Sequence, residues 1–402
     1  MPKINPEVLL WARETAGLQR EGAAYKLGIN ASKGRSATER LTRLERGDDE
    51  PTRPMLAKMA KLYRRPLLTF YLSGPPKKGE RGEDFRTLPA NRPESADALL
   101  DALLRDIRAR QSIVRAALEE DESAKELGFI SSMKMDAGPN AVLASIKDWL
   151  NFSREEYRAQ RTAEAGFDLL RSRAEANGIF VLLIGNLGSH HTAFNLDTFR
   201  GFALADKLAP FLIINDQDAK TAWSFTLLHE LAHLWIGATG ISGAWSNAGV
   251  EMFCNAVATE FFLSDSELKQ LDVNENSKTE NDIRLISVFS NERNLSRTMV
   301  AYRLYLIKQI PEAKWEALRK HFRTEWLRNK EIQKERAQED ESGPSYYVVK
   351  RHRLGRAILE FTNRTLAEGE LTPSKAGKVL GVKARNVAPL LQFLDVQSGR
   401  VN

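Results

Sequence analysis

The sequence predicts a mostly α-helical protein, of the α+β class overall, with a small three-stranded sheet in its central part. Apolar residues recur at helical spacing through most of the 402 residues. Three short and largely apolar runs interrupt this pattern, and they predict buried strands rather than helices. The predicted strands are 179–184, 200–205 and 211–214.

A stretch rich in proline, glycine and charge divides the chain near its start. Such residues break both helices and strands and oppose burial, so this stretch predicts a linker. We expect an N-terminal helical bundle at 1–72, the linker at 73–98, a central domain at 99–340 with its core at about 176–270, and a C-terminal helical module at 341–402.

The composition is that of a soluble globular protein in a reducing compartment. Hydrophobic residues make up 42% and charged residues 28% of the chain. No apolar run approaches the roughly 18–20 residues of a membrane span, and the first residues lack the apolar segment of a secretory signal. The single cysteine, Cys254, excludes an internal disulfide framework. We therefore expect a cytoplasmic protein with no membrane contact.

The basic excess of the chain lies in its N-terminal fifth. Residues 1–80 contain 16 Lys and Arg and 9 Asp and Glu, a net charge of 16 − 9 = +7, whereas the whole chain has +6. The remainder therefore sums to −1. This asymmetry favours an anionic partner for the N-terminal part, most simply nucleic acid. A solvated basic face is the alternative.

The N-terminal part also contains a helix–turn–helix pattern. Residues 23–29 read Ala-Ala-Tyr-Lys-Leu-Gly-Ile, with small residues inside, a core leucine and a glycine at the turn. A polar helix follows at 36–46, and this order resembles Xre/Cro-type domains. Candidate contacts to DNA or to a partner protein are Arg35, Arg40, Arg43 and Arg46. The loop at 30–35 is longer than usual, so a bundle for protein docking or homodimerisation is the alternative.

Further helices are expected along the rest of the chain. They are 96–127, 142–150, 154–177 ending at Gly178, two helices within 280–307 with Ser296 as an N-cap, 311–341, and 346–368. Residues 376–382 repeat the Ala-x-x-x-Leu-Gly-Val pattern of the N-terminal bundle. The C-terminal module is therefore either a second helix–turn–helix or a helical packing cap.

The central feature is His229-Glu230-Leu-Ala-His233, an H-E-x-x-H motif on an apolar helix. Residues four apart share one helix face, so both imidazoles can bind one tetrahedral zinc ion. Glu230 projects about 100° away round the helix, where a general base for a zinc-bound water belongs. The motif predicts one Zn²⁺ and a hydrolase.

A third ligand is expected on the next helix. Glu251 lies 18 residues after His233, and Asn255 follows one turn later, where it can support a histidine ligand. This spacing resembles the glutamate-type zincins, or gluzincins. Glu260 is the competing ligand, and Cys254 is expected to be a packed small residue.

Two further requirements of a peptidase remain open in the sequence. Candidates for stabilising the oxyanion are Tyr302, Arg303, His190 and His191, each of which also has a structural explanation. The strand at 200–205 is expected at the edge of the sheet, where a substrate could add as another strand.

The central domain resembles the ImmA/IrrE family of metallopeptidases. The matching segments are 199–206, 213–215, 225–235 and 251–263, and Asp84-Phe-Arg86 also fits. The resemblance implies a cytoplasmic zinc endopeptidase that makes a limited cut in a repressor or antitoxin-like protein, with roles in stress responses and transcription regulation. The alternative is a non-catalytic DNA-binding regulator that uses the zincin fold as an interaction module.

Overall fold

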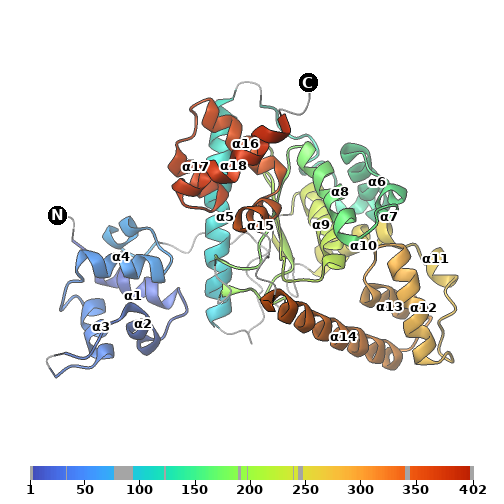
Figure 1. Cartoon of the computed structure of the whole chain (residues 1–402), viewed down its shortest axis with the longest axis horizontal. Coiled ribbons are helices and arrows are strands. Elements are labelled where there is room, and N and C mark those ends of the chain that lie inside the picture. Colours follow the sequence, from blue (N-terminus) through green and yellow to red (C-terminus); the bar gives the residue numbers. More distant parts are fainter. Residues whose placement is uncertain are drawn as a thin grey trace. The chain divides into compact units, whose positions relative to one another are not determined.

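The computed structural model describes residues 3–32, 34–76, 94–121, 124–188, 192–196, 198–238, 240–242, 248–339 and 345–398. The chain forms two compact units. One comprises Met1–Ile107 with Asn186–Phe194, and the other comprises Arg108–Gly185 with Asn195–Asn402. The helical content and the presence of a small sheet agree with the predicted class (Figure 1). Within the described part of the chain, no helix combines the length and apolar content needed to span a bilayer.

The first unit is built on four short helices around one apolar core. They are α1 (Pro6–Glu14), α2 (Arg20–Leu27), α3 (Ala37–Arg46) and α4 (Arg53–Leu62), followed by the 3₁₀ helix η1 (Leu67–Tyr71). The turn after α2 is made by Gly28 at φ 70°, a left-handed conformation that favours glycine. Ser36 and Glu39 form a capping box that starts α3. Helix α3 and the turn at Gly28 lie where the sequence predicts them, and the function of this bundle as a helix–turn–helix stays a prediction.

A buried ion pair holds this bundle together. Arg13 of α1 donates to Glu45 of α3 at 2.5 and 3.2 Å, and Arg20 of α2 reaches the same carboxylate at 2.9 Å. Arg13 and Glu45 are almost fully buried. A buried charge is tolerated only with such partners, so this pair fixes α1, α2 and α3 against one another.

The long helix α5 (Glu94–Glu120) continues from the first unit into the second. Before the sheet come η3 (Met135–Ala137), α6 (Pro139–Leu150), α7 (Arg154–Arg158) and α8 (Ala163–Ala176). The single helix predicted at 154–177 is wrong, because two caps start separate helices. Ser153 forms a capping box at α7, and Thr162 accepts a hydrogen bond from the Ala165 N–H at the start of α8. Gly178 has φ 83°, as predicted for the end of α8.

The sheet has four strands, one more than predicted. Strands β1 (Phe180–Leu183), β2 (Gly201–Leu204) and β3 (Phe211–Ile214) lie where expected, and β4 (Gly240–Ser242) is added. The order is β1-β3-β2-β4, with β1 parallel to β3 and the other pairs antiparallel. The prediction that 200–205 is an edge strand is therefore wrong: β2 pairs on both sides, and β4 forms that edge.

The remaining helices follow along the second unit. They are α9 (Lys220–Ile236), α10 (Ala248–Phe262), α11 (Asp265–Lys269), α12 (Thr279–Glu292), α13 (Arg297–Leu306), α14 (Glu312–Glu339), α15 (Tyr346–Leu354), α16 (Arg356–Ala367), α17 (Pro373–Leu380), η5 (Ala384–Asn386) and α18 (Val387–Ser398). Helix α9 packs on β2 and β3, and α15 packs on β1. Ser296 occupies the N-cap position of α13 but its side chain makes no cap hydrogen bond.

The helix predicted at 346–368 is also divided. Gly355 has φ 80° and ψ 171°, which ends α15 and starts α16. A side chain at this position would lie 2.0 Å from a Glu175 carboxylate oxygen, so glycine is required both for conformation and for space. The break between α15 and α16 therefore lies where the C-terminal helices contact α8.

Candidate metal centre

Helix α9 presents the H-E-x-x-H motif inside the core. Its residues from 226 to 235 are all buried, because the helix is apolar on every side and is covered by α6, α8, α10 and the sheet. His229, Glu230 and His233 are 4%, 0% and 1% exposed. The helix ends at Gly237, which has φ 71°. The polar residues of the motif are thus held in dry, low-dielectric surroundings.

The two histidines converge with Glu251 of α10. The Nε2 atoms of His229 and His233 lie 3.1 Å apart. Glu251 reaches them with one carboxylate oxygen each, at 3.3 Å from His229 and 3.2 Å from His233. Nitrogen and oxygen atoms from two helices therefore form a small triangle, and the structure brings the three predicted ligands together as a possible metal-binding group.

The size of this triangle fits a zinc ion. Two ligand atoms at ~2.0–2.1 Å from one tetrahedral Zn²⁺ lie about 3.3–3.4 Å apart. The two Nε2 atoms lie 3.1 Å apart, and each has a different carboxylate oxygen of Glu251 at 3.3 or 3.2 Å, so every one of these contacts is close to that edge length. Two imidazoles and one carboxylate are also a donor set that zinc accepts with a fourth position left open.

Asn255 orients the first histidine. The Nδ1 atom of His229 lies 3.0 Å from Oδ1 of Asn255, one turn beyond Glu251 on α10. An amide oxygen only accepts hydrogen bonds, so Nδ1 carries the proton and the lone pair of Nε2 faces the triangle. This is the supporting role that the sequence predicts for Asn255.

The surroundings of His233 favour positive charge. Burial alone would lower its pKa, but hydrogen bonds to Cys254 and Glu251 and the charge of Glu230 outweigh burial and raise the pKa of His233 to about 11. Burial raises the pKa of the Cys254 thiol. The negative surroundings that favour a proton on this ring would equally favour a divalent cation in the triangle.

Residues 181–305 match the family model of the IrrE N-terminal-like domain of the M78 peptidases. This part of the chain is similar to M78 peptidases. The match begins in β1 and ends in α13, so it includes the sheet, α9 and α10. It supports the ImmA/IrrE resemblance and a metallopeptidase-type role. Comparisons with curated proteins and with solved structures find no match.

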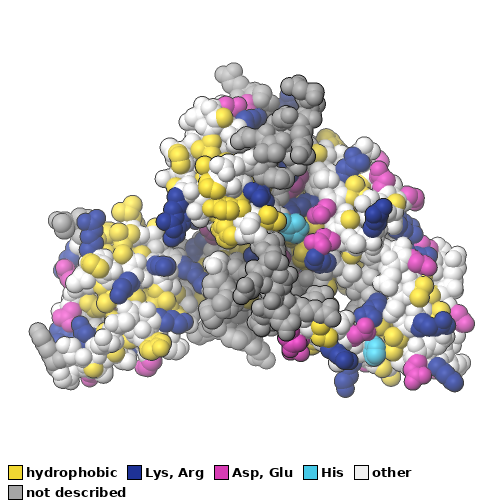
Figure 2. Space-filling model, viewed as in Figure 1, with side chains coloured by type: hydrophobic (Ala, Val, Ile, Leu, Met, Phe, Trp, Pro, Cys, Tyr) yellow, Lys and Arg dark blue, Asp and Glu magenta, His cyan; other side chains and the backbone are white. Residues whose placement is uncertain are grey.

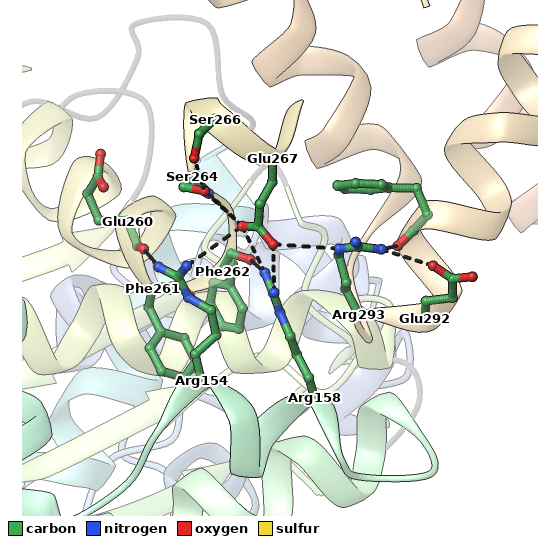
Figure 3. A network of polar contacts seen from close by, with 11 residues as sticks. Arg154, Arg158, Glu260, Phe261, Phe262, Ser264, Ser266, Glu267, Glu292 and Arg293 are labelled. Carbon is green, nitrogen blue, oxygen red and sulfur yellow. Dashed lines mark hydrogen bonds and ion pairs between the residues drawn. The ribbon is translucent and has the colours of Figure 1, made fainter. Parts of the chain in front are cut away.

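Arginines of α7 hold the far end of α10 within the M78-like domain (Figure 3). Arg154 donates to the carbonyl of Phe261 at 2.6 Å, and Arg158 donates to that of Phe262 at 2.9 Å. Arg158 also pairs with Glu267 of α11 at 2.7 and 3.1 Å. Cations at the last carbonyls of a helix satisfy them and complement the helix dipole. The helix that carries Glu251 is therefore fixed at its C-terminal end.

The other predicted site residues do not join the triangle. The carbonyl of Glu260, the competing ligand, is a partner of Arg154 at the end of α10. Tyr302 is 43% exposed and its ring lies 5.2 Å from that of Trp315, while Arg303 pairs with Asp265. The oxyanion candidates His190 and His191 lie outside the described residues.

Sequence reasoning missed the polar contact of Cys254. It expected only packing, and the side chain is indeed fully buried. However, the thiol also lies close enough to His233 to raise the pKa of that imidazole. The available signal was its place between Glu251 and Asn255, on the part of α10 that approaches α9. A cysteine in such a place can support a ligand without being one.

Two of the arginines that the sequence proposes as DNA contacts, both on α3, already have partners within the protein. Arg43 is bound by Asp49 at 2.8 and 3.2 Å, and Arg40 donates to the Asn30 carbonyl at 2.7 Å. Arg35 and Arg46 are exposed. Internal acidic partners reduce the charge that Arg43 can offer to a phosphate.

The basic surface of the first unit instead follows α4. No acidic residue occurs between positions 51 and 79, a stretch with seven Lys and Arg residues. Four of them are exposed in the structure: Arg53, Lys58, Lys61 and Arg64. Nearby in sequence, Leu68 is 78% exposed. Figure 2 likewise shows Lys and Arg side chains beside hydrophobic ones on the visible face of this unit.

Proposed function

We propose that this protein is a zinc-dependent endopeptidase that makes a limited cut in one regulatory protein, of the repressor or antitoxin type. The observation that carries the proposal is the group of His229 and His233 on the buried α9 with Glu251 on α10, at a spacing that fits zinc. The similarity of residues 181–305 to M78 peptidases supports a peptidase rather than another zinc hydrolase.

Each residue has a defined task in the proposed reaction. His229, His233 and Glu251 would hold the ion, and Asn255 fixes the orientation of His229. When bound, zinc supplies Lewis-acid polarisation and lowers the pKa of a coordinated water. Glu230 is the general base: its carboxylate accepts the proton of the attacking water and can return it to the departing amine. Complete burial of Glu230 keeps competing bulk water away from this carboxylate.

The decisive experiment is co-expression with the protein encoded beside this one. We expect the partner to be cut once in the presence of the wild-type chain and to stay intact with Glu230→Gln, which leaves the three ligands in place. Zinc content is measured on both purified proteins. If the wild-type chain and the Glu230→Gln variant both contain zinc but the wild type leaves the partner intact, the peptidase function is contradicted and a regulator is favoured.

A DNA-binding regulator is the second candidate, and the exposed cations of α4 favour it. A gel shift on the promoter of the protein's own operon, at two salt concentrations, tests this function. Phosphate contacts give binding that weakens steeply with salt. We expect the variant Lys58→Glu/Lys61→Glu to lose more binding than Arg43→Ala, because Arg43 is already paired with Asp49. Absence of a shift at low salt would exclude DNA as the partner.

A further inference from the structure

Strand β2 approaches α9 more closely than an ordinary side chain permits. A Cβ atom at Gly201 would lie 2.6 Å from Cγ2 of Thr226, 2.7 Å from Oε1 of Glu230 and 3.1 Å from Cγ of Glu230. Thr226 and Glu230 are four residues apart, so both lie on the face of α9 that meets the strand. The carboxylate of Glu230 therefore occupies the space that a side chain at position 201 would fill.

Glycine is needed at position 201 because there is no space for a side chain, and not because of the backbone conformation. Gly201 is absent from the positive-φ glycines of the described residues, so alanine could adopt its backbone. The strand also cannot retreat easily, because Gly201 pairs with Ile214 of β3 on one side and with Ser242 of β4 on the other. A new methyl group would have to be accommodated by Thr226 and Glu230.

From this geometry we infer that Gly201 is a positioning residue for Glu230. The bare backbone of β2 leaves room for this buried carboxylate on α9, the helix that also carries the two histidines. The inference rests on the proposed function, because it assigns Gly201 to the base of that reaction. Strand β2 then contributes to the site because glycine, which has no side chain, occupies position 201.

The substitution Gly201→Ala tests this role. We expect it to displace Glu230 while leaving His229, His233 and Glu251 in place, so zinc affinity in a chelator competition should be unchanged. In assays with the purified partner, cleavage should fall about 10²-fold in kcat with KM unchanged, as expected when a reacting group moves by about 1 Å. Gly128→Ala is the matched control, because its Cβ would meet only Trp149, at an ordinary 3.8 Å. Cleavage at the wild-type rate by Gly201→Ala would overturn the inference.

A second variant separates positioning from general destabilisation. Thr226→Ser in the Gly201→Ala background removes the methyl group that the new Cβ would meet at 2.6 Å, but leaves the clash with Glu230. We expect Gly201→Ala to lower the melting temperature and this double variant to regain part of that loss, but not the cleavage. If cleavage recovers together with stability, the effect of Gly201→Ala was structural and the inference is wrong.

A readout without substrate distinguishes this inference from the proposed function. The protein is loaded with Co²⁺, and its visible absorption is followed as the pH is raised through neutrality. Glu230→Gln should shift the inflection of this titration, and Gly201→Ala should shift it in the same direction. A shift with Glu230→Gln alone would refute the role of Gly201, even if no partner is ever cut. If both variants shift the titration but the partner stays intact, the positioning role stands and the peptidase function fails.

Discussion

Asn255 decides which imidazole nitrogen of His229 faces the metal centre. Its side-chain oxygen accepts the Nδ1 proton at 3.0 Å. We predict that Asn255→Ala weakens zinc binding about 10- to 100-fold, which is typical for loss of a residue that orients a histidine ligand. Competition with a coloured chelator measures the affinity.

The control for this prediction is Asn255→Asp. A carboxylate keeps an acceptor oxygen in the same place, so Asn255→Asp should bind zinc close to the wild-type affinity. Equal weakening by both substitutions would show that packing of α10, and not the hydrogen bond, determines the effect.

The sequence predicted the residues of this site unevenly. The spacing of His229, Glu230 and His233 within one helix is enough to predict their roles. Glu251 and Asn255 could be predicted because they lie one turn apart on the next helix. The contact of Cys254 with His233 and the space at Gly201 depend on how closely two elements approach, and no local pattern encodes that distance. For the space at position 201, the signal in the sequence is the pair of small residues Gly201 and Ala203, which alternate along β2.

Among the elements, α10 depends on a charge network at its C-terminal end. Burial would raise the pKa of Glu267, but hydrogen bonds from Arg158 and Ser264 outweigh burial and lower it to about 2. A carboxyl whose pKa is lower in the folded state stabilises the fold above its unfolded pKa and loses this effect as the pH falls. The contribution is therefore present above about pH 4.5 and disappears toward pH 2.

We predict that Glu267→Gln lowers stability near neutral pH by about 1 kcal/mol, a modest value because the pair is partly solvated. The difference from the wild type should shrink as the pH falls from about 4.5 toward 2. Melting temperatures of both proteins across this range measure it. A difference that stays constant with pH would show that the charge of Glu267 is not responsible.

Element prediction succeeded for continuous apolar runs, and it failed for a very short strand and where caps divide a long helical pattern. Strands β1, β2 and β3 are continuous apolar runs, but β4 has only three residues, Gly240-Ile-Ser242, and no pattern of its own. The break between α7 and α8 was signalled by Ser153 and Thr162, whose capping hydrogen bonds outweigh the helical periodicity that runs through both helices.

On the scale of the whole molecule, the C-terminal helices of the second unit pack against its helix α8. Buried Arg171 of α8 donates to the carbonyls of His352 and Arg353 at 2.6 and 3.2 Å and pairs with Glu175 at 3.1 Å. Glu175 in turn accepts the Arg356 N–H at 2.9 Å. These contacts hold the Gly355 break, and with it α15 and α16, against α8. They support the packing-cap interpretation of the C-terminal module.

We predict that Arg171→Met loosens this module. The substitution leaves Glu175 buried without its cation, a change that typically costs about 3–5 kcal/mol. Limited proteolysis should then cut within α15 to α18 faster than in the wild type. Arg364→Ala is the control, since its pair with Asp121 is half-exposed and should contribute little. Identical cleavage patterns for Arg171→Met and the wild type would show that other contacts hold the module.

The close packing of β2 on α9 also bears on how inactive copies of such a domain would arise. A single base change that replaces Gly201 would leave the H-E-x-x-H motif and Glu251 intact. Under the proposed function, such a chain would still fold and bind zinc and its partner, yet it would no longer cut the partner. Searches that count the motif alone would score it as a working peptidase. The residue at position 201 would distinguish an inactive copy from an active enzyme.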